Sequence, residues 1–124
     1  MYERLAREVV DAAFTVHTRL GPGLLESVYE TVLEFELKKR GLHVDRQVPI
    51  ALRYDNLYLQ EAFKADLIVG NKLIIELKSI EKVLPVHKKQ LLTYLSLSDK
   101  KLGLLINFGA PLIKEGIVRL VNGL

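Results

Sequence analysis

Two carboxylates and a lysine lie close together in residues 65–78, where apolar runs on both sides predict strands. Both runs are rich in β-branched residues, and Gly70-Asn71 between them has the composition of a tight hairpin turn. Because side chains alternate along a strand, Glu76 and Lys78 share one face. Asp66 precedes the turn and could bring a second carboxylate to the same end of the hairpin.

These residue types in this arrangement fit phosphoryl chemistry. A buried carboxylate is costly unless it is paired or binds a metal, and two neighbouring carboxylates suit a hard divalent cation such as magnesium. An ammonium beside them could orient or help to deprotonate a water and offset charge on a phosphoryl group. The alternative is that Glu76 and Lys78 form a solvated pair on an ordinary hairpin and that Asp66 is unrelated. Spacing alone favours this alternative, because short patterns recur by chance.

The same residues resemble a known signature. Asp66, followed after nine residues by Glu76-Leu77-Lys78, is similar to the D-x(n)-E-x-K pattern of the PD-(D/E)xK nuclease superfamily. The segment 23–29 fits the pattern G-x-x-E-x-x-Y, after which one family of that superfamily is named, and the segment 104–109 resembles the strand that follows. The resemblance extends from about Arg19 onward. Ala65 stands where the superfamily's name has a proline.

The resemblance implies a set of roles around a metal. Asp66, Glu76 and the backbone carbonyl of Leu77 would hold Mg²⁺ or Mn²⁺, and Lys78 would act on the attacking water. Glu26 would complete the metal site from a helix above the sheet. In the same pattern, Tyr29 would support the site or contact nucleic acid. Without the resemblance, Glu26 reads as a first-turn acid favoured by the helix dipole, and Tyr29 as a core aromatic residue.

A second motif follows the hairpin. Gln90 and Tyr94 lie one turn apart on the same face of a predicted helix. They resemble the Q-x-x-x-Y motif of the exonuclease-like branch of the superfamily, which helps to hold the substrate or the site. Four basic side chains are candidates for phosphate contacts, although solvated surface charges are the default interpretation: Lys64, His87, Lys88 and Lys89.

The order of predicted elements indicates an α/β fold. The sequence Gly21-Pro22-Gly23 ends the first predicted helix and separates it from the second. Pro49 predicts that its strand lies at an edge of the sheet or carries a bulge. The resulting mixed β-sheet flanked by helices, a three-layer α/β/α core, is what the restriction-endonuclease-like resemblance implies. We expect helices over 3–20, 24–40 and 83–97, and strands over 43–53, 57–63, 65–69, 73–77, 101–107 and part of 110–121.

Composition places this fold in one compact domain, 1–124, with enough apolar material for a core: 49% of residues are hydrophobic and 27% are charged. The sequence contains no cysteine, which excludes a disulfide framework and a thiolate site and suits a cytoplasmic setting. We expect neither an export signal nor a membrane span, so no membrane partner is predicted.

The charge distribution favours a polyanion as partner. The net charge is +3; residues 1–60 carry 8 Lys and Arg against 9 Asp and Glu, whereas residues 61–124 carry 10 against 6. We therefore expect a metal-dependent nuclease that cuts DNA with structural or weak selectivity, with RNA as a further candidate, and that works as a homodimer to reach both strands. Two alternatives remain: a non-catalytic module that keeps the fold and binds nucleic acid or protein, and a metal hydrolase of small molecules.

Overall fold

The computed structural model describes residues 1–123 and contains three α-helices, five strands and a short 3-10 helix in this range. The element boundaries follow the sequence-based expectations closely, except that the two strands expected over 57–63 and 65–69 are one continuous strand. The elements are α1 (Tyr2–Leu20), α2 (Glu26–Lys39), β1 (Val44–Tyr54), β2 (Leu57–Val69), β3 (Leu73–Lys78), α3 (Pro85–Ser98), β4 (Leu102–Asn107), η1 (Ile113–Gly116) and β5 (Ile117–Val121).

The five strands form one mixed sheet in the order β1-β2-β3-β4-β5. All neighbouring strands are antiparallel except β3 and β4, which are parallel and are connected through α3. A parallel pair needs such a crossover, whereas antiparallel neighbours need only a turn. Pro49 lies on the edge strand β1, as its missing N–H predicts.

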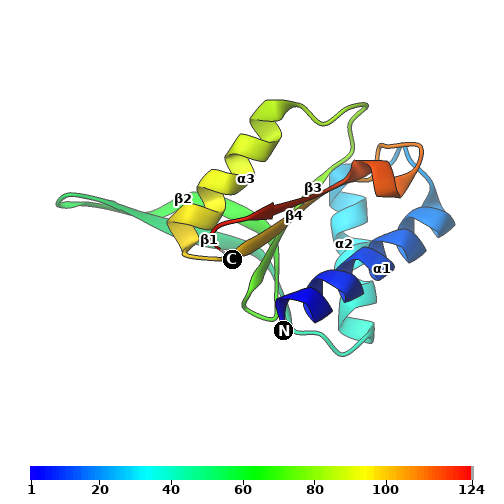
Figure 1. Cartoon of the computed structure of the whole chain (residues 1–124), viewed down its shortest axis with the longest axis horizontal. Helices are drawn as coiled ribbons and strands as arrows, with labels where there is room; N and C mark the ends of the chain where they lie inside the picture. The colour runs from blue at the N-terminus through cyan, green and yellow to red at the C-terminus, as the bar shows by residue number, and fades with distance from the viewer. Residues whose placement is uncertain (124) are drawn as a thin grey trace.

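The sheet separates two helical layers (Figure 1). α1 and α2 cover one face, while α3 covers the other. This arrangement confirms the predicted α/β fold with a mixed sheet between helices. No helix within residues 1–123 is long and apolar enough to cross a membrane.

The hairpin that carries the candidate site has the predicted turn. Gly70 and Asn71 both have left-handed backbone angles, with φ of 59° and 58°, which match the twist of the flanking strands. Lys72 also lies in the turn, so the register begins with Val69 opposite Leu73 and continues to Leu67 opposite Ile75. Beyond that pair the two strands separate, and Asp66 and Glu76 lie at the point where they do so.

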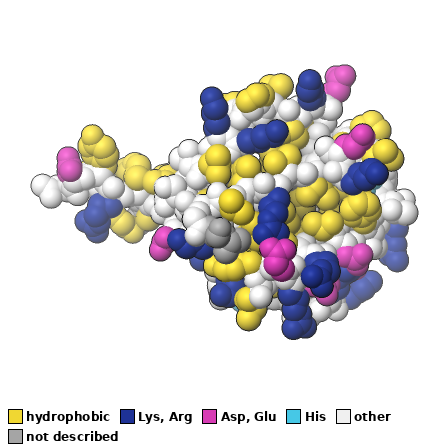
Figure 2. All heavy atoms as spheres, viewed as in Figure 1, with side chains coloured by type: hydrophobic (Ala, Val, Ile, Leu, Met, Phe, Trp, Pro, Cys, Tyr) yellow, Lys and Arg dark blue, Asp and Glu magenta, His cyan; other side chains and the backbone are white. Residues whose placement is uncertain are grey.

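The hairpin of β1 and β2 extends well beyond the rest of the molecule as a two-stranded arm, which we define as residues 50–63 (Figure 1). The arm turns at Asp55-Asn56, with a left-handed φ of 51° at Asp55. Figure 2 shows hydrophobic side chains along this projection, in contact with no other part of the chain at its tip.

The β1–β2 ribbon turns over at Gln47 and Asp66. Ala65 packs in the apolar cluster under α3, yet Leu67, only two residues later, packs in the cluster under α1 and α2. In a regular strand these two side chains would share a face. Gln47, which lies between the pairs that flank Asp66, has a left-handed φ of 51° and so bends the ribbon there.

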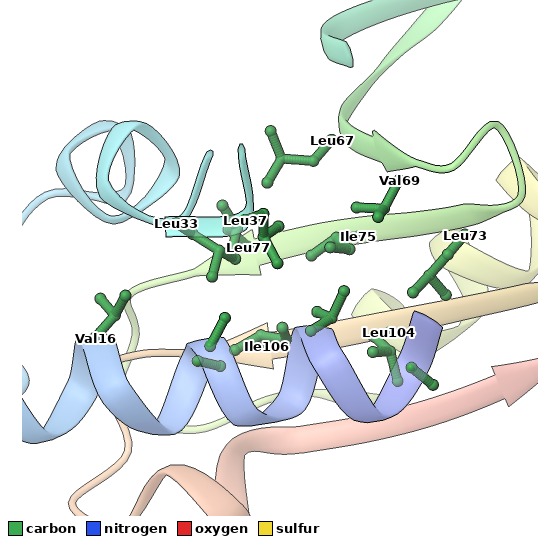
Figure 3. Packing of buried hydrophobic residues seen from close by; sticks show 14 of the residues in the cluster. Val16, Leu33, Leu37, Leu67, Val69, Leu73, Ile75, Leu77, Leu104 and Ile106 are labelled. Carbon is green, nitrogen blue, oxygen red and sulfur yellow. The ribbon is translucent and has the colours of Figure 1, made fainter. Parts of the chain in front are cut away.

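The main core lies between the sheet and the α1–α2 layer (Figure 3). Leu73, Ile75 and Leu77 of β3 point into it, whereas Ile74 packs under α3. The alternation predicted for β3 is therefore confirmed, and it directs the charged residues that follow Ile74 towards the α3 side.

Candidate active site

The carboxylates of Asp66 and Glu76 each accept a hydrogen bond from a backbone N–H of the opposite strand. The Leu77 N–H donates to Oδ2 of Asp66 at 2.9 Å, and the Asp66 N–H donates to Oε1 of Glu76 at 3.3 Å. These bonds replace the strand-to-strand bonds that end where β2 and β3 separate. The predicted convergence of the two carboxylates at one end of the hairpin is therefore present.

The pKa of the Glu76 carboxyl is strongly raised in the folded protein. Its side chain lies in a buried position, with 9% of the residue exposed. Burial, together with the negative charge of Asp66, raises the pKa of Glu76 to about 9, and the positive charge of Lys78 offsets part of that increase. A proton or a cation is therefore needed for the two carboxylates to remain together near neutral pH.

This donor set fits a hard divalent cation. Carboxylate oxygens are the ligands that Mg²⁺ and Mn²⁺ prefer, and a cation would relieve the repulsion that otherwise raises the pKa of Glu76. Within residues 1–123, however, no group of three or more His, Cys, Asp or Glu side chains lies close enough to hold a metal. A metal here would take two carboxylates and complete its coordination with carbonyl or solvent oxygens.

Lys78 is the last residue of β3, and the chain directly after it is fixed in place. The Asn107 side chain accepts from the Ile80 N–H at 3.0 Å and donates to the Ile80 carbonyl at 2.9 Å. Gly109 approaches Ile80 so closely that a Cβ at this glycine would lie 2.2 Å from the Ile80 carbonyl oxygen. Ser79 donates to the Leu24 carbonyl and so joins this segment to the loop before α2.

A cleft of about 770 Å³ opens beside this segment. The loop between α1 and α2 forms one wall, with Glu26 and Ser27 from the start of α2, and Ser79 to Glu81 form the other wall. The lining begins at Ser79, directly after Lys78, whereas the two carboxylates lie outside it.

Glu26 lines this cleft but does not join Asp66 and Glu76 in a metal-binding cluster. The assignment of Glu26 as a further metal ligand therefore stays a prediction. Glu26 is the first residue of α2 and is exposed at the rim of the cleft.

The helix carboxylate that reaches Asp66 is Glu30, one turn further along α2. The side-chain amide of Gln47 donates to Oε1 of Glu30 at 2.9 Å and to Oδ1 of Asp66 at 3.3 Å. Arg46 donates to the other oxygen of Glu30 at 2.5 Å, which compensates this buried charge. Arg46 is therefore paired with an acid and is not available to bind phosphate. Because this ion pair neutralises the Glu30 carboxylate, that carboxylate is not buried as an unpaired charge.

Sequence reasoning missed the link through Gln47. Its only sequence signal is the repeat of Glu26 and Glu30 at a spacing of four, which places both on one side of α2. The backbone at Gln47 is left-handed and turns the side-chain amide towards both acids. Sequence patterns predict a left-handed residue mainly at glycine or asparagine, so this conformation could not be predicted at a glutamine.

Tyr29 is fully buried, so the prediction that it contacts nucleic acid is wrong. Its hydroxyl donates to the Gly21 carbonyl at 2.5 Å and accepts from the Leu24 N–H at 3.2 Å, and its ring stacks on Phe108 at 4.6 Å. Gly23, within that loop, has a φ of 105° that favours glycine. The G-x-x-E-x-x-Y pattern thus shapes the loop that presents Glu26 to the cleft.

Tyr94 of α3 lies near the carboxylate pair. Burial, followed by the negative charges of Glu76 and Asp66, raises the pKa of the Tyr94 hydroxyl. Its ring stacks on Phe63 at 3.7 Å, at the base of the arm. Gln90 lies one turn before Tyr94 and is exposed, so this face of α3 borders the site.

The predicted phosphate-binding residues occupy different positions. Lys88 and Lys89 are exposed near the start of α3, and Lys64 is exposed on β2, 3.9 Å from Glu61. His87 is half-buried, and its Nδ1 accepts from the Leu84 N–H at 3.0 Å. One nitrogen of His87 therefore stabilises the helix start rather than facing a ligand.

Comparison with known families gives one match. A family model described as the PD-(D/E)XK nuclease superfamily matches residues 3–120, which include every residue of the site. Comparisons with curated proteins and with solved structures gave no significant match.

Proposed function

Because the chain belongs to the PD-(D/E)XK nuclease superfamily, we propose that it is a metal-dependent nuclease that hydrolyses phosphodiester bonds in DNA. The observation that carries this proposal is the reciprocal bonding of Asp66 and Glu76 beside Lys78. Such a pair needs a cation near neutral pH. We also propose that two copies act together, so that both strands of a duplex are reached.

In this mechanism Asp66 and Glu76 would hold Mg²⁺ or Mn²⁺, and the Leu77 carbonyl would be a further oxygen ligand. The bound ion supplies Lewis-acid stabilisation of the negative charge that develops at the phosphoryl group. Lys78 orients the attacking water and offsets charge through its ammonium group. Tyr94 and Gln90 contact the substrate from the α3 side, with exposed Lys88 and Lys89 binding phosphates without reading sequence.

Gln47 acts as a positioning residue for Asp66. Replacing Gln47 by alanine removes the amide that joins Asp66 to Glu30, so the Asp66 carboxylate gains freedom to rotate. We expect the cleavage rate to fall by about 10–100-fold, as for other residues that orient metal ligands. The measurement is the rate over a magnesium titration: the magnesium concentration for half-maximal rate should rise. The exposed Gln60, on the arm, provides the matched control Gln60→Ala.

The proposed function is tested by incubating the pure protein with single-stranded, duplex and branched DNA and with RNA of matched sequences. Each substrate is combined with magnesium, with manganese or with a chelator. We expect cleavage of DNA with either metal and none with the chelator. Faster cleavage of RNA than of DNA would show that RNA, and not DNA, is the preferred substrate. Binding without cleavage under every condition would favour a non-catalytic module.

A further inference from the structure

The projecting arm carries an apolar face that nothing in its own chain covers at the tip. Cross-strand pairs place Leu52 opposite Leu59 and Tyr54 opposite Leu57, so all four side chains lie on one face. Tyr54 is 69% exposed and Leu57 is 57% exposed. This face continues to Phe63, which packs against α3 at the base of the arm.

The opposite face of the arm has a different character. Arg53 lies opposite Tyr58, and its guanidinium is 5.2 Å from the centre of the Tyr58 ring. At the base, exposed Lys64 lies 3.9 Å from exposed Glu61, beside the register shift between Ile50 and Leu52. Towards the tip, the arm therefore has one face with a cation–aromatic pair and one aliphatic face.

A two-stranded ribbon alone in water is at best marginally stable, and its exposed aliphatic face adds to that cost. Covering this face would therefore stabilise the arm. The arm's projection from the body means that its tip can be covered only by another molecule (Figure 2).

Charge and side-chain chemistry identify the kind of molecule. Within residues 50–63 the arm carries Arg53 against Asp55 and Glu61, a formal net charge of −1, so it has no excess positive charge to attract a polyanion. Three of the four side chains on the apolar face are leucines, which neither stack on bases nor bond to phosphates. The surface therefore fits protein rather than nucleic acid.

We infer that the arm joins two copies of this chain, with the apolar face of one arm packed against the same face of the other. Such an isologous contact needs only one self-complementary patch, and Lys64 at the base of each arm offsets the formal charge of −1 that the arm carries. Two β layers packed face to face lie about 10 Å apart, which brings Leu59 of one copy close to Leu59 of the other. This interface is independent of the nuclease chemistry, since a mass measurement detects it without substrate.

Light scattering over a concentration series measures the assembly of the full chain. We expect a dimer, and we expect Leu57→Asp or Leu59→Asp to raise its dissociation constant by about a hundredfold, because each dimer receives two buried charges. Tyr58→Asp, on the opposite face of the same turn, is the matched control and should leave the dimer intact. A wild-type monomer at every concentration, or a dimer that both leucine variants leave unchanged, would overturn the inference.

Cross-linking locates the contact even if an aspartate variant fails to fold. The sequence contains no cysteine, so Leu59→Cys and Tyr58→Cys each introduce a single thiol. With a bis-maleimide linker of about 10 Å, the spacing of packed β layers, Leu59→Cys should yield covalent dimers and Tyr58→Cys few or none. Equal yields from both faces would contradict the face-to-face contact.

Discussion

Replacing Lys78 by alanine is expected to abolish metal-dependent cleavage while leaving DNA binding partly intact. The ammonium lies close enough to the carboxylate pair to lower the pKa of Glu76, so it acts where charge develops on the phosphoryl group. Loss of a group that assists proton transfer reduces rates by about 10²–10⁴-fold. The structural role of Lys78 lies in its backbone carbonyl, which accepts from the Phe108 N–H at 2.8 Å, and alanine preserves that bond. Rates on a labelled duplex and binding by fluorescence anisotropy separate the two effects.

A matched lysine lies at the other end of the same strand. Lys72, in the turn before β3, has its ammonium 5.3 Å from the centre of the Tyr2 ring, away from the carboxylate pair. Lys72→Ala should cleave at nearly the wild-type rate. Asp66→Ala and Glu76→Ala should lose activity as Lys78→Ala does, and cleavage that persists in all three variants would disprove the site.

The hairpin and its carboxylates could be predicted because their signals are local. Gly70-Asn71 predicts a turn, and two left-handed residues form it. The register could not be predicted from this signal: Lys72 also lies in the loop, so Val69 pairs with Leu73, and this pairing places Asp66 opposite Glu76. Pro49 gave the edge position of β1 for an equally local reason, its missing N–H.

The choice between Glu26 and Glu30 could not be predicted from sequence. The two acids lie one helical turn apart, so helical periodicity places both on the same side. The decision depends on where α2 begins and on Arg46 and Gln47, which are distant in sequence and bond to Glu30 across the ribbon. The bend at Gln47 is a tertiary effect, because an L-residue with positive φ is retained only when its surroundings hold it there.

Tyr29 illustrates a related limit. Its spacing from Glu26 suggested that both residues serve the site directly, yet one faces the cleft and the other is buried against Phe108. A three-residue separation on a helix turns side chains by about 60° relative to each other, since each residue contributes about 100°. That difference is enough to place one residue at the rim and the other in the core.

Glu76→Gln is expected to stabilise the metal-free protein at neutral pH, although it removes a proposed metal ligand. The pKa of Glu76 is raised in the folded state, from an ordinary value of 4.5 to about 9, so the folded protein binds more protons than the unfolded chain between these values. The free energy of unfolding of the wild type therefore falls as pH rises through this window, and the glutamine variant escapes that loss. At pH 7 the difference should be up to about 3 kcal/mol in favour of Glu76→Gln, and it should vanish below the ordinary pKa.

Urea denaturation with chelator at a series of pH values measures this difference, and Glu81→Gln, an exposed acid at the cleft, is the matched control. Adding magnesium should reverse the order of stability. A ligand that binds only the folded state stabilises it by mass action, so the wild type should gain stability with magnesium while Glu76→Gln gains little. If the free energy of unfolding of wild type and variant changed with pH in the same way, the pKa of Glu76 would not be raised in the folded state. An equal response of both proteins to magnesium would exclude Glu76 as a metal ligand without any reference to activity, so this measurement tests the metal site even if no substrate is cut.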